Sequence, residues 1–496
     1  MDMKMESEGQ FKSTYPIEEP YVYAAILEDP VTKEVTYKVI EPTLTPEDKI
    51  LLEKLKKIFL DELDIDISEI SKDKAHVIVE ERIRKIIKNY KMRVDEGLLN
   101  KILYYIKRDF LGFEKIDPLM KDHFIEDISC DGVGVPIYVW HREYESIKTN
   151  LKYDDEEELN RFVVRLAYLC GKHLSVADPI LDASLPDGSR VNATFSSEIS
   201  RKGATFTIRR FRADPLTIVD LIQLGTISPD VAAYLWFAIE NKSSILIAGE
   251  VASGKTTLLN CTCMFIRPDM KIVSIEETPE LNLPHTNWIP LATRTGFGRK
   301  ASDITLFELL KNALRQRPDY IIVGEVRGEE AYTLFQALAT GHGVQATIHA
   351  DTPEKVVSRL ESEPMNVPRP LIGLLDIIMV QSRVKIGDKS ARRTLTVTEI
   401  KGYDSQSKEI LLNHIARWDP SVDRHILEGE SEVLKRIAER RGMSLDDAKS
   451  ELNKRKVILN WMLKKGMRRY LEIGNVLREY YSDSERLFKR ALVESL

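Results

Sequence analysis

The chain has 496 residues, of which 43% are hydrophobic and 30% are charged, and its formal net charge at pH 7 is −6. These values predict a folded protein of about two to four domains and exclude a disordered chain. The acidic balance argues against a general nucleic-acid binder, although local basic patches would be compatible with it.

Nothing in the sequence predicts a membrane span or an export signal. No apolar run reaches the ~18 residues that a span requires, and the polar, acid-rich first 20 residues lack an apolar export segment. The four cysteines, Cys130, Cys170, Cys261 and Cys263, are compatible with a reducing cytoplasm. Because no second cysteine pair accompanies Cys261 and Cys263, we interpret all four as small buried residues. We expect a cytoplasmic protein that reaches the membrane only through partners.

The N-terminal quarter of the chain is expected to be an arm followed by helices. Residues 1 to about 40 are interpreted as extended or weakly ordered. A Thr-Pro-Glu-Asp sequence at residues 45–48 then combines an N-cap with a proline at the first helical position, which predicts the start of a helix. Charged amphipathic helix continues to about residue 108. Residues 1–116 are therefore predicted to be an N-terminal arm and helical region.

The rest of the chain is predicted to form two α/β domains and a helical end. Residues 117–212 mix short strands with helices around a Pro-Asp-Gly turn, and they predict a mixed α/β N-terminal domain. A linker is expected over residues 213–218. Residues 219–420 alternate strand and helix, which is typical of a parallel sheet. Residues 421–496 are charged and helix-rich, and they predict a C-terminal helical extension.

The most informative segment, residues 243–257, predicts a phosphate-binding loop. An apolar run that reads as a buried strand leads into Gly249-x-x-x-x-Gly254-Lys255-Thr256 and then into the start of a helix. Lys255 is expected to reach the β- and γ-phosphates of a nucleotide, and the Thr256 hydroxyl to bind Mg²⁺. The alternative is an ordinary glycine-rich turn. The expected nucleotide contacts come from Gly249, Glu250, Val251, Ala252, Ser253, Gly254, Lys255, Thr256 and Thr257.

Two later apolar strands end in carboxylates. Residues 271–275 lead into Glu276 and Glu277, and residues 319–324 lead into Glu325, in the manner of a Walker B strand. An acid at the carboxyl edge of a parallel sheet can polarise a water molecule or hold Mg²⁺. The three glutamates are therefore candidate catalytic groups, and Glu325 joins Thr256 as a candidate metal ligand. The alternatives are a solvated strand end for the first pair and an ion pair with Arg327 for Glu325.

A third apolar segment, residues 344–348, leads into His349. A lone histidine at a strand end is more often a structural hydrogen-bonding group. Like Glu277 and Glu325, however, His349 follows the end of an apolar strand, and this shared placement favours a role near the γ-phosphate.

Together, the segments GEVASGKTT, IEETPEL, LRQRPDYIIVGEVRG and GHGVQATIHA resemble the Walker A, Asp box, Walker B and His box of the type II/type IV secretion ATPase superfamily. The resemblance covers about residues 117–420. The motifs are most similar to those of archaeal GspE-like and FlaI-like members. The resemblance implies a RecA-like ATPase domain joined to a mixed α/β N-terminal domain, with ATP and Mg²⁺ as cofactors. It also implies a homo-hexamer that powers protein secretion or the assembly of pilus-like or archaellum filaments. The implied partner is a polytopic membrane platform protein, and no nucleic acid is expected.

The sequence departs from the family pattern in its Asp box. Many members have Glu-Asp where this chain has Glu276-Glu277, so the sequence leaves open which carboxylate acts. The resemblance also places Arg294 and Arg315 near neighbouring phosphates. Arg209 and Arg210, just before the predicted linker, are further candidates to reach the nucleotide.

Two other functions stay open at this point. A RecA-type nucleic-acid motor would share the sheet and the phosphate-binding loop, but it would need a basic channel that bears aromatic residues. A nucleotide-dependent scaffold without turnover would not need Lys255, Thr256 and Glu325. The sequence does not distinguish secretion, pilus assembly and archaellum function.

Overall fold

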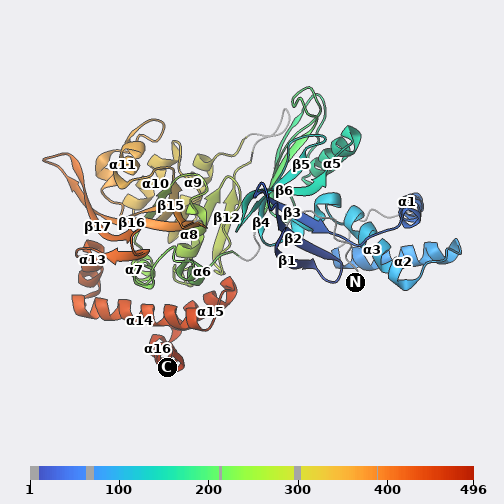
Figure 1. The fold of residues 1–496 in the computed structure, drawn as a ribbon. Coiled ribbons are helices and arrows are strands. Elements are labelled where there is room, and N and C mark those ends of the chain that lie inside the picture. Colours follow the sequence, from blue (N-terminus) through green and yellow to red (C-terminus); the bar gives the residue numbers. More distant parts are fainter. Residues whose placement is uncertain (1–9, 63–71, 212–214, 295–302, 388, 496) are drawn as a thin grey trace. The chain divides into compact units, whose positions relative to one another are not determined.

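The computed structural model describes residues 10–62, 72–211, 215–294, 303–387 and 389–495 (Figure 1). The chain divides into two compact units, Met1–Phe211 and Arg212–Leu496. Two residues of the predicted linker, 213 and 214, lie outside the described residues.

The first unit is built on a nine-stranded sheet in the order β1-β2-β3-β6-β5-β4-β9-β8-β7. Only the β3–β6 pairing is parallel. The strands are β1 (Gln10–Glu18), β2 (Val22–Glu28), β3 (Val35–Ile40), β4 (Ile125–Cys130), β5 (Pro136–His141), β6 (Glu145–Lys152), β7 (Ile180–Ser184), β8 (Arg190–Thr194) and β9 (Thr205–Arg209).

Five α-helices accompany this sheet in the described residues of the first unit: α1 (Pro46–Asp61), α2 (Lys72–Asn89), α3 (Glu96–Phe110), α4 (Asp117–Lys121) and α5 (Glu156–Leu169). The helix predicted to start after Thr45 is confirmed as α1, since the Thr45 side chain accepts a hydrogen bond from the Asp48 backbone N–H. Helices α1, α2 and α3 bury their apolar faces against one another and form a small core of their own.

The prediction of a loose N-terminal arm is wrong for residues 10–40, which form β1, β2 and β3. Ala24 and Ile26 are fully buried in the main core of the unit, and the Tyr37 hydroxyl donates a hydrogen bond to Asp122 at 2.5 Å. The short apolar run of β2 is the signal that was missed. Because β3 pairs with β6, residues on both sides of position 116 contribute to a single sheet.

The second unit contains a nine-stranded sheet in the order β12-β11-β13-β14-β10-β15-β16-β17-β18. The strands from β12 to β15 in this order are parallel, as predicted, and β16, β17 and β18 extend the sheet with antiparallel pairs. The strands are β10 (Ile245–Gly249), β11 (Ile272–Glu276), β12 (Trp288–Ala292), β13 (Tyr320–Val323), β14 (Gly343–Ile348), β15 (Ile377–Ile386), β16 (Lys389–Asp404), β17 (Glu409–Asp419) and β18 (Arg424–Leu427).

Helices cover both faces of this parallel sheet. They are α6 (Ile218–Gln223), α7 (Pro229–Glu240), α8 (Lys255–Cys263), α9 (Leu306–Leu314), α10 (Glu330–Ala339), α11 (Pro353–Glu361), α12 (Arg369–Ile372), α13 (Glu432–Arg441), α14 (Leu445–Lys464), α15 (Tyr470–Ser482) and α16 (Ser484–Ser495). Helices α6, α7, α8 and α13–α16 share a core with one face, and α9–α12 share a core with the other. Strands β10 and β13 are therefore buried at every residue and read as continuous apolar runs.

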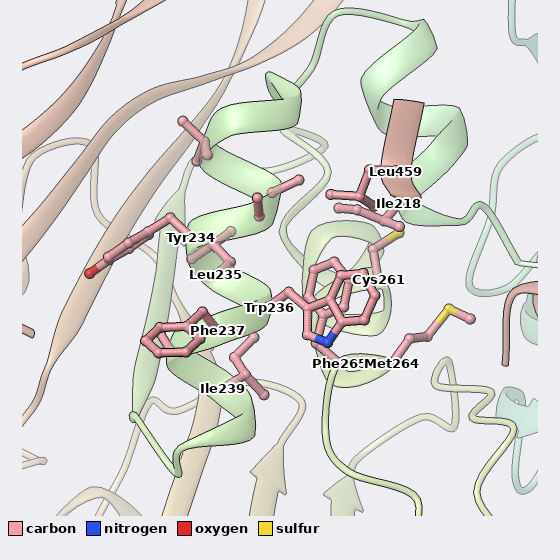
Figure 2. Packing of buried hydrophobic residues seen from close by; sticks show 14 of the residues in the cluster. Ile218, Tyr234, Leu235, Trp236, Phe237, Ile239, Cys261, Met264, Phe265 and Leu459 are labelled. Atoms are coloured by element: carbon pink, nitrogen blue, oxygen red, sulfur yellow. The ribbon is translucent and has the colours of Figure 1, made fainter. Parts of the chain in front are cut away.

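The core around α7 explains why this helix is apolar almost all round. Figure 2 shows Trp236 stacked on Phe265, with Ile218 and Leu459 close by, and the two rings are 5.4 Å apart and nearly parallel. Since Leu459 belongs to α14, α7 is covered by the sheet on one side and by the C-terminal helices on the other. Such a helix has no side that must face water.

The predicted C-terminal helical region is an integral part of the second unit. Arg455 on α14 is 1% exposed and lies 2.7 Å from Glu240 on α7 and 2.8 Å from Glu451. Its guanidinium also lies over the rings of Trp236 and Tyr480. None of the four cysteines forms a disulfide bond; Cys130, Cys261 and Cys263 are buried as expected, whereas Cys170 is partly exposed. The described residues contain no cluster of three potential metal ligands. Within the same ranges, no helix combines the length and the apolarity needed to cross a bilayer.

Replacing Arg455 with alanine is expected to destabilise the second unit. The change leaves Glu240 buried without its main cation, and removing one partner of a buried pair typically costs about 3–5 kcal/mol. The measurement is the thermal unfolding midpoint. Lys435→Ala on α13, which removes exposed ion pairs, is the matched control and should unfold near the wild-type temperature. Equal midpoints for wild type and Arg455→Ala would contradict the role of this ion pair.

Candidate functional site

The loop between β10 and α8 has the geometry of an anion cradle, in the predicted context of strand, loop and helix. Gly254 adopts a left-handed conformation with φ of +90°, which favours glycine. A Cβ atom on Gly249 would lie 2.3 Å from the backbone oxygen of Gln381, so a side chain is excluded there. The Ser253 hydroxyl donates to the Glu250 carbonyl at 2.8 Å and closes the loop. Backbone N–H groups at such a helix start are available to bind phosphate.

Lys255, the first residue of α8, is 8% exposed. Its Nζ donates to the Glu250 carbonyl at 2.8 Å and lies 3.3 Å from Nδ1 of His349. Burial lowers the pKa of Lys255, and the nearby Glu325 carboxylate opposes that shift. Thr256 and Thr257 follow in the first helical turn and are half-buried. The ammonium group therefore lies at the loop with uncharged atoms as its direct hydrogen-bond acceptors.

His349 and Glu325 meet beside this lysine. Nε2 of His349 lies 3.1 Å from Oε1 of Glu325. Because Nδ1 faces the ammonium group of Lys255 and must accept, the network assigns the imidazole proton to Nε2, which donates to Glu325. The alternative pairing of Glu325 with Arg327 is not what the contacts show, since Arg327 contacts Glu277. Lysine, histidine and carboxylate thus form one hydrogen-bonded series at the carboxyl edge of the sheet.

The two adjacent acids at the end of β11 occupy different environments. Glu276 is 3% exposed and its Oε1 accepts hydrogen bonds from the backbone N–H groups of Glu280 and Leu281, at 2.9 and 3.1 Å. Burial raises the pKa of Glu276 to about 7. Glu277 is exposed and contacts Arg327. Glu276 therefore holds the following loop in place, whereas Glu277 can reach solvent.

The predicted arginines are distributed over several places. The Arg210 guanidinium donates to the backbone carbonyls of Asp122 and Ile125, and burial lowers its pKa. Arg209 is an exposed residue of β9. The contacts of Arg210 are those of a structural residue of the first unit, and its prediction as a nucleotide contact gains no support from them.

Arg294 and Arg315 are both exposed residues of the second unit. Arg294 forms a backbone bridge with Ile304, and the intervening residues 295–302 lie outside the described residues. Arg315 follows the C-terminal end of α9, just before β13 begins. It therefore lies at the edge of the sheet opposite the one that carries Lys255 and Glu325, so it cannot act on the site of its own chain.

Arg392 is a cationic residue at the loop that the sequence analysis did not identify. Nε of Arg392, on β16, donates to the Ala252 carbonyl at 3.4 Å. The two residues are far apart in the sequence, and only the order β10-β15-β16 brings them together. No local sequence signal could have found this contact.

An open pocket of about 630 Å³ adjoins the loop on another side. The loop residues Gly249, Glu250 and Val251 and the α11 residues Lys355 and Arg359 line part of it. The Arg359 guanidinium donates to the backbone carbonyl of His349 at 2.9 Å. Helix α11 is therefore tied to the strand end that carries this histidine.

A sequence profile described as "Type II/IV secretion system protein" matches residues 113–439. The chain belongs to this family. The four motifs quoted above lie within the matched residues, as does the whole parallel sheet. This assignment confirms the resemblance to secretion ATPases and, with the sheet order and the phosphate-binding loop, the predicted fold class of a RecA-like P-loop domain with a mixed α/β N-terminal domain.

The chain is also similar to individual relatives and solved structures. The chain is 37% identical to the Methanocaldococcus jannaschii protein MJ0900, over 94% of this chain and 88% of that protein. It is similar to the VirB11 ATPase of the Brucella suis type IV secretion system, with 25% identity over 56% of this chain and 90% of that one and a TM-score of 0.30. It is also similar to the pilus retraction motor PilT, with 18% identity over 71% of this chain and 92% of that one and a TM-score of 0.41.

The buried acid of the secretion-family Asp box predicts a pH effect on stability. In the unfolded chain Glu276 ionises above about pH 4.5, whereas in the folded protein it stays protonated up to about pH 7. Stability should therefore fall as the pH rises between these values, by about 3 kcal/mol in total. Glu276→Gln has no ionisable group at this position and does not lose this stability. Its thermal unfolding midpoint, relative to that of the wild type, should therefore rise between pH 5 and pH 8. Glu277→Gln controls for the substitution itself. Parallel pH profiles for Glu276→Gln and wild type would contradict the prediction.

Proposed function

We propose that this chain is an ATPase motor that hydrolyses ATP with Mg²⁺ to power protein secretion or the assembly of pilus-like or archaellum filaments. The observation that carries the proposal is the series formed by Lys255, His349 and Glu325 beside the phosphate-binding loop, in a member of the type II/IV secretion family. A scaffold without turnover would have no use for a carboxylate at this point. The family assignment gives no support to the alternative of a nucleic-acid motor.

The residues at the loop fit a nucleotide and a divalent cation. Gly249 and Gly254 leave the cradle without side chains that would block it. The Thr256 hydroxyl and the Glu325 carboxylate are hard oxygen donors of the kind that Mg²⁺ prefers. A bound Mg²⁺ ion would supply neutralisation of the charge that develops on the phosphates.

The residues around the loop can be assigned roles in hydrolysis. Lys255 exchanges its contact with the Glu250 carbonyl for the β- and γ-phosphates, because anionic oxygens are the stronger acceptors. His349 donates to Glu325 and so fixes the direction in which that carboxylate points. Glu325 or Glu277 orients the attacking water. Between the two acids of the Asp box, the burial of Glu276 favours Glu277 for this role.

Two substitutions separate nucleotide binding from hydrolysis. Lys255→Ala is expected to lose turnover by a factor of about 10²–10³, because it removes the cation that stabilises the phosphates in the transition state. Glu325→Gln keeps the shape of the side chain and should bind ATP normally while hydrolysing it slowly. Phosphate release and binding of a fluorescent ATP analogue are the measurements. Normal turnover in Lys255→Ala would rule out this loop as the active site, and stimulation of turnover by single-stranded DNA would favour a nucleic-acid motor.

The proposal includes a homo-hexamer that works with a polytopic membrane platform protein at the inner face of the membrane. The site lies at an open sheet edge, where water can screen the charge that develops during hydrolysis. Motors of this kind complete the site with an arginine from outside the domain. Arg294 and Arg315 are exposed on the second unit, and the position of Arg315 allows it to serve only a neighbouring chain.

Turnover per chain should therefore rise with protein concentration, as the subunits that supply arginines assemble. Arg315→Ala is expected to lower turnover with little loss of ATP binding, while Arg486→Ala on the exposed surface of α16 should leave it unchanged. Activity across a dilution series, followed together with light scattering, is the measurement. Full specific activity in a monomer would contradict the assembled site.

A further inference from the structure

The hairpin of β15 and β16 extends past the phosphate-binding loop. Gly249, the last residue of β10, pairs with Gln381 on β15, yet β15 continues to Ile386. The outer part of the hairpin therefore rises beyond the carboxyl edge of the parallel strands, next to the loop.

One face of this hairpin is basic. Arg383 on β15 lies directly opposite Arg392 on β16, so their side chains share a face with Cβ atoms about 5 Å apart. Lys385 lies two residues further along and shares that face. In the described part of the chain, none of these three side chains forms an ion pair with a carboxylate. Like charges directly opposite each other are destabilising, and an anion bound between them would remove the repulsion.

This basic face is turned toward the start of α8. Nε of Arg392 donates to the Ala252 carbonyl at 3.4 Å, and a Cβ atom on Gly254 would lie 3.3 Å from Cδ of Arg392. The same Cβ would lie 3.8 Å from Nε2 of Gln381, a buried side chain that accepts a hydrogen bond from Thr394. The stem of Arg392 thus packs against the glycine that begins the helix, which places its guanidinium at the mouth of the cradle.

The sheet order puts this arginine on the opposite side of the loop from the catalytic groups. Glu325 and His349 follow β13 and β14, which lie on one side of β10, whereas β15 and β16 lie on the other side. A nucleotide whose γ-phosphate is next to Glu325 must therefore extend its other end toward the hairpin.

We propose that Arg392, assisted by Arg383, binds the α-phosphate of the nucleotide held by the loop. This inference rests on the proposed function, since it names a further contact of the same site. A guanidinium can bind a phosphate through two parallel N–H donors, and no carboxylate of the described residues competes for it. The contact fixes the direction in which the nucleotide lies, with the γ-phosphate toward Glu325.

The test is Arg392→Gln, which keeps most of the stem that packs against Gly254 and removes the charge. We expect the affinities for ADP and ATP to fall by the same factor, about 10- to 100-fold, because both nucleotides carry the α-phosphate. KM should rise while kcat changes little, as for a contact made equally in the ground and transition states. Arg383→Ala should weaken both nucleotides in the same direction but less. Lys401→Ala, an exposed lysine farther along β16, is the matched control and should bind like the wild type.

Two results would overturn the inference. One is wild-type affinity of Arg392→Gln for ADP. The other is an equal loss of affinity for inorganic pyrophosphate, which would mean that Arg392 supports the loop rather than the α-phosphate. Failure of the proposed function has a different signature, because Lys255→Ala would then bind ADP and ATP as well as the wild type does.

Discussion

A parallel sheet that is buried on both faces can present polar groups only where its strands end, and this constraint determines the site. Strands β10, β11, β13 and β14 lie side by side, with apolar residues along their lengths. Their carboxyl ends meet at one edge. Polar residues that follow the strands are therefore brought together without any contact between their own sequence neighbourhoods. Lys255, Glu325 and His349 come together for this reason.

At this edge, two adjacent glutamates occupy different environments and have different roles. Glu276 is the last residue of β11 and is buried, whereas Glu277 follows the end of the strand and is exposed. The buried acid is satisfied by two backbone N–H groups and organises the loop that follows it. His349 lies between a cation and an anion and orders both. At this site the imidazole of His349 lies between the Lys255 ammonium group and the Glu325 carboxylate, and the backbone of the phosphate-binding loop accepts a further hydrogen bond from Lys255.

The rigidity of the site depends on the packing behind it. Helix α8 carries the loop at its start, and the chain just after it contributes Phe265, which stacks on Trp236 of α7 (Figure 2). Helix α14 closes the other side of α7, and Arg455 joins the two through Glu240. The C-terminal helices therefore support the helix on which the nucleotide cradle depends, although they lie far from it in sequence.

The sequence by itself determined the phosphate-binding loop, the strand-end acids, the histidine and the family, because each depends on spacing within a few residues. It also indicated the helix at Thr45 and the parallel sheet through local capping and alternation. Only the tertiary structure decided that residues 10–40 are strands of a sheet, that Glu276 is buried and Glu277 is not, and that Arg392 lies over the start of α8. These features depend on which strands become neighbours, and that order is fixed by burial and pairing between distant segments, which no local pattern records.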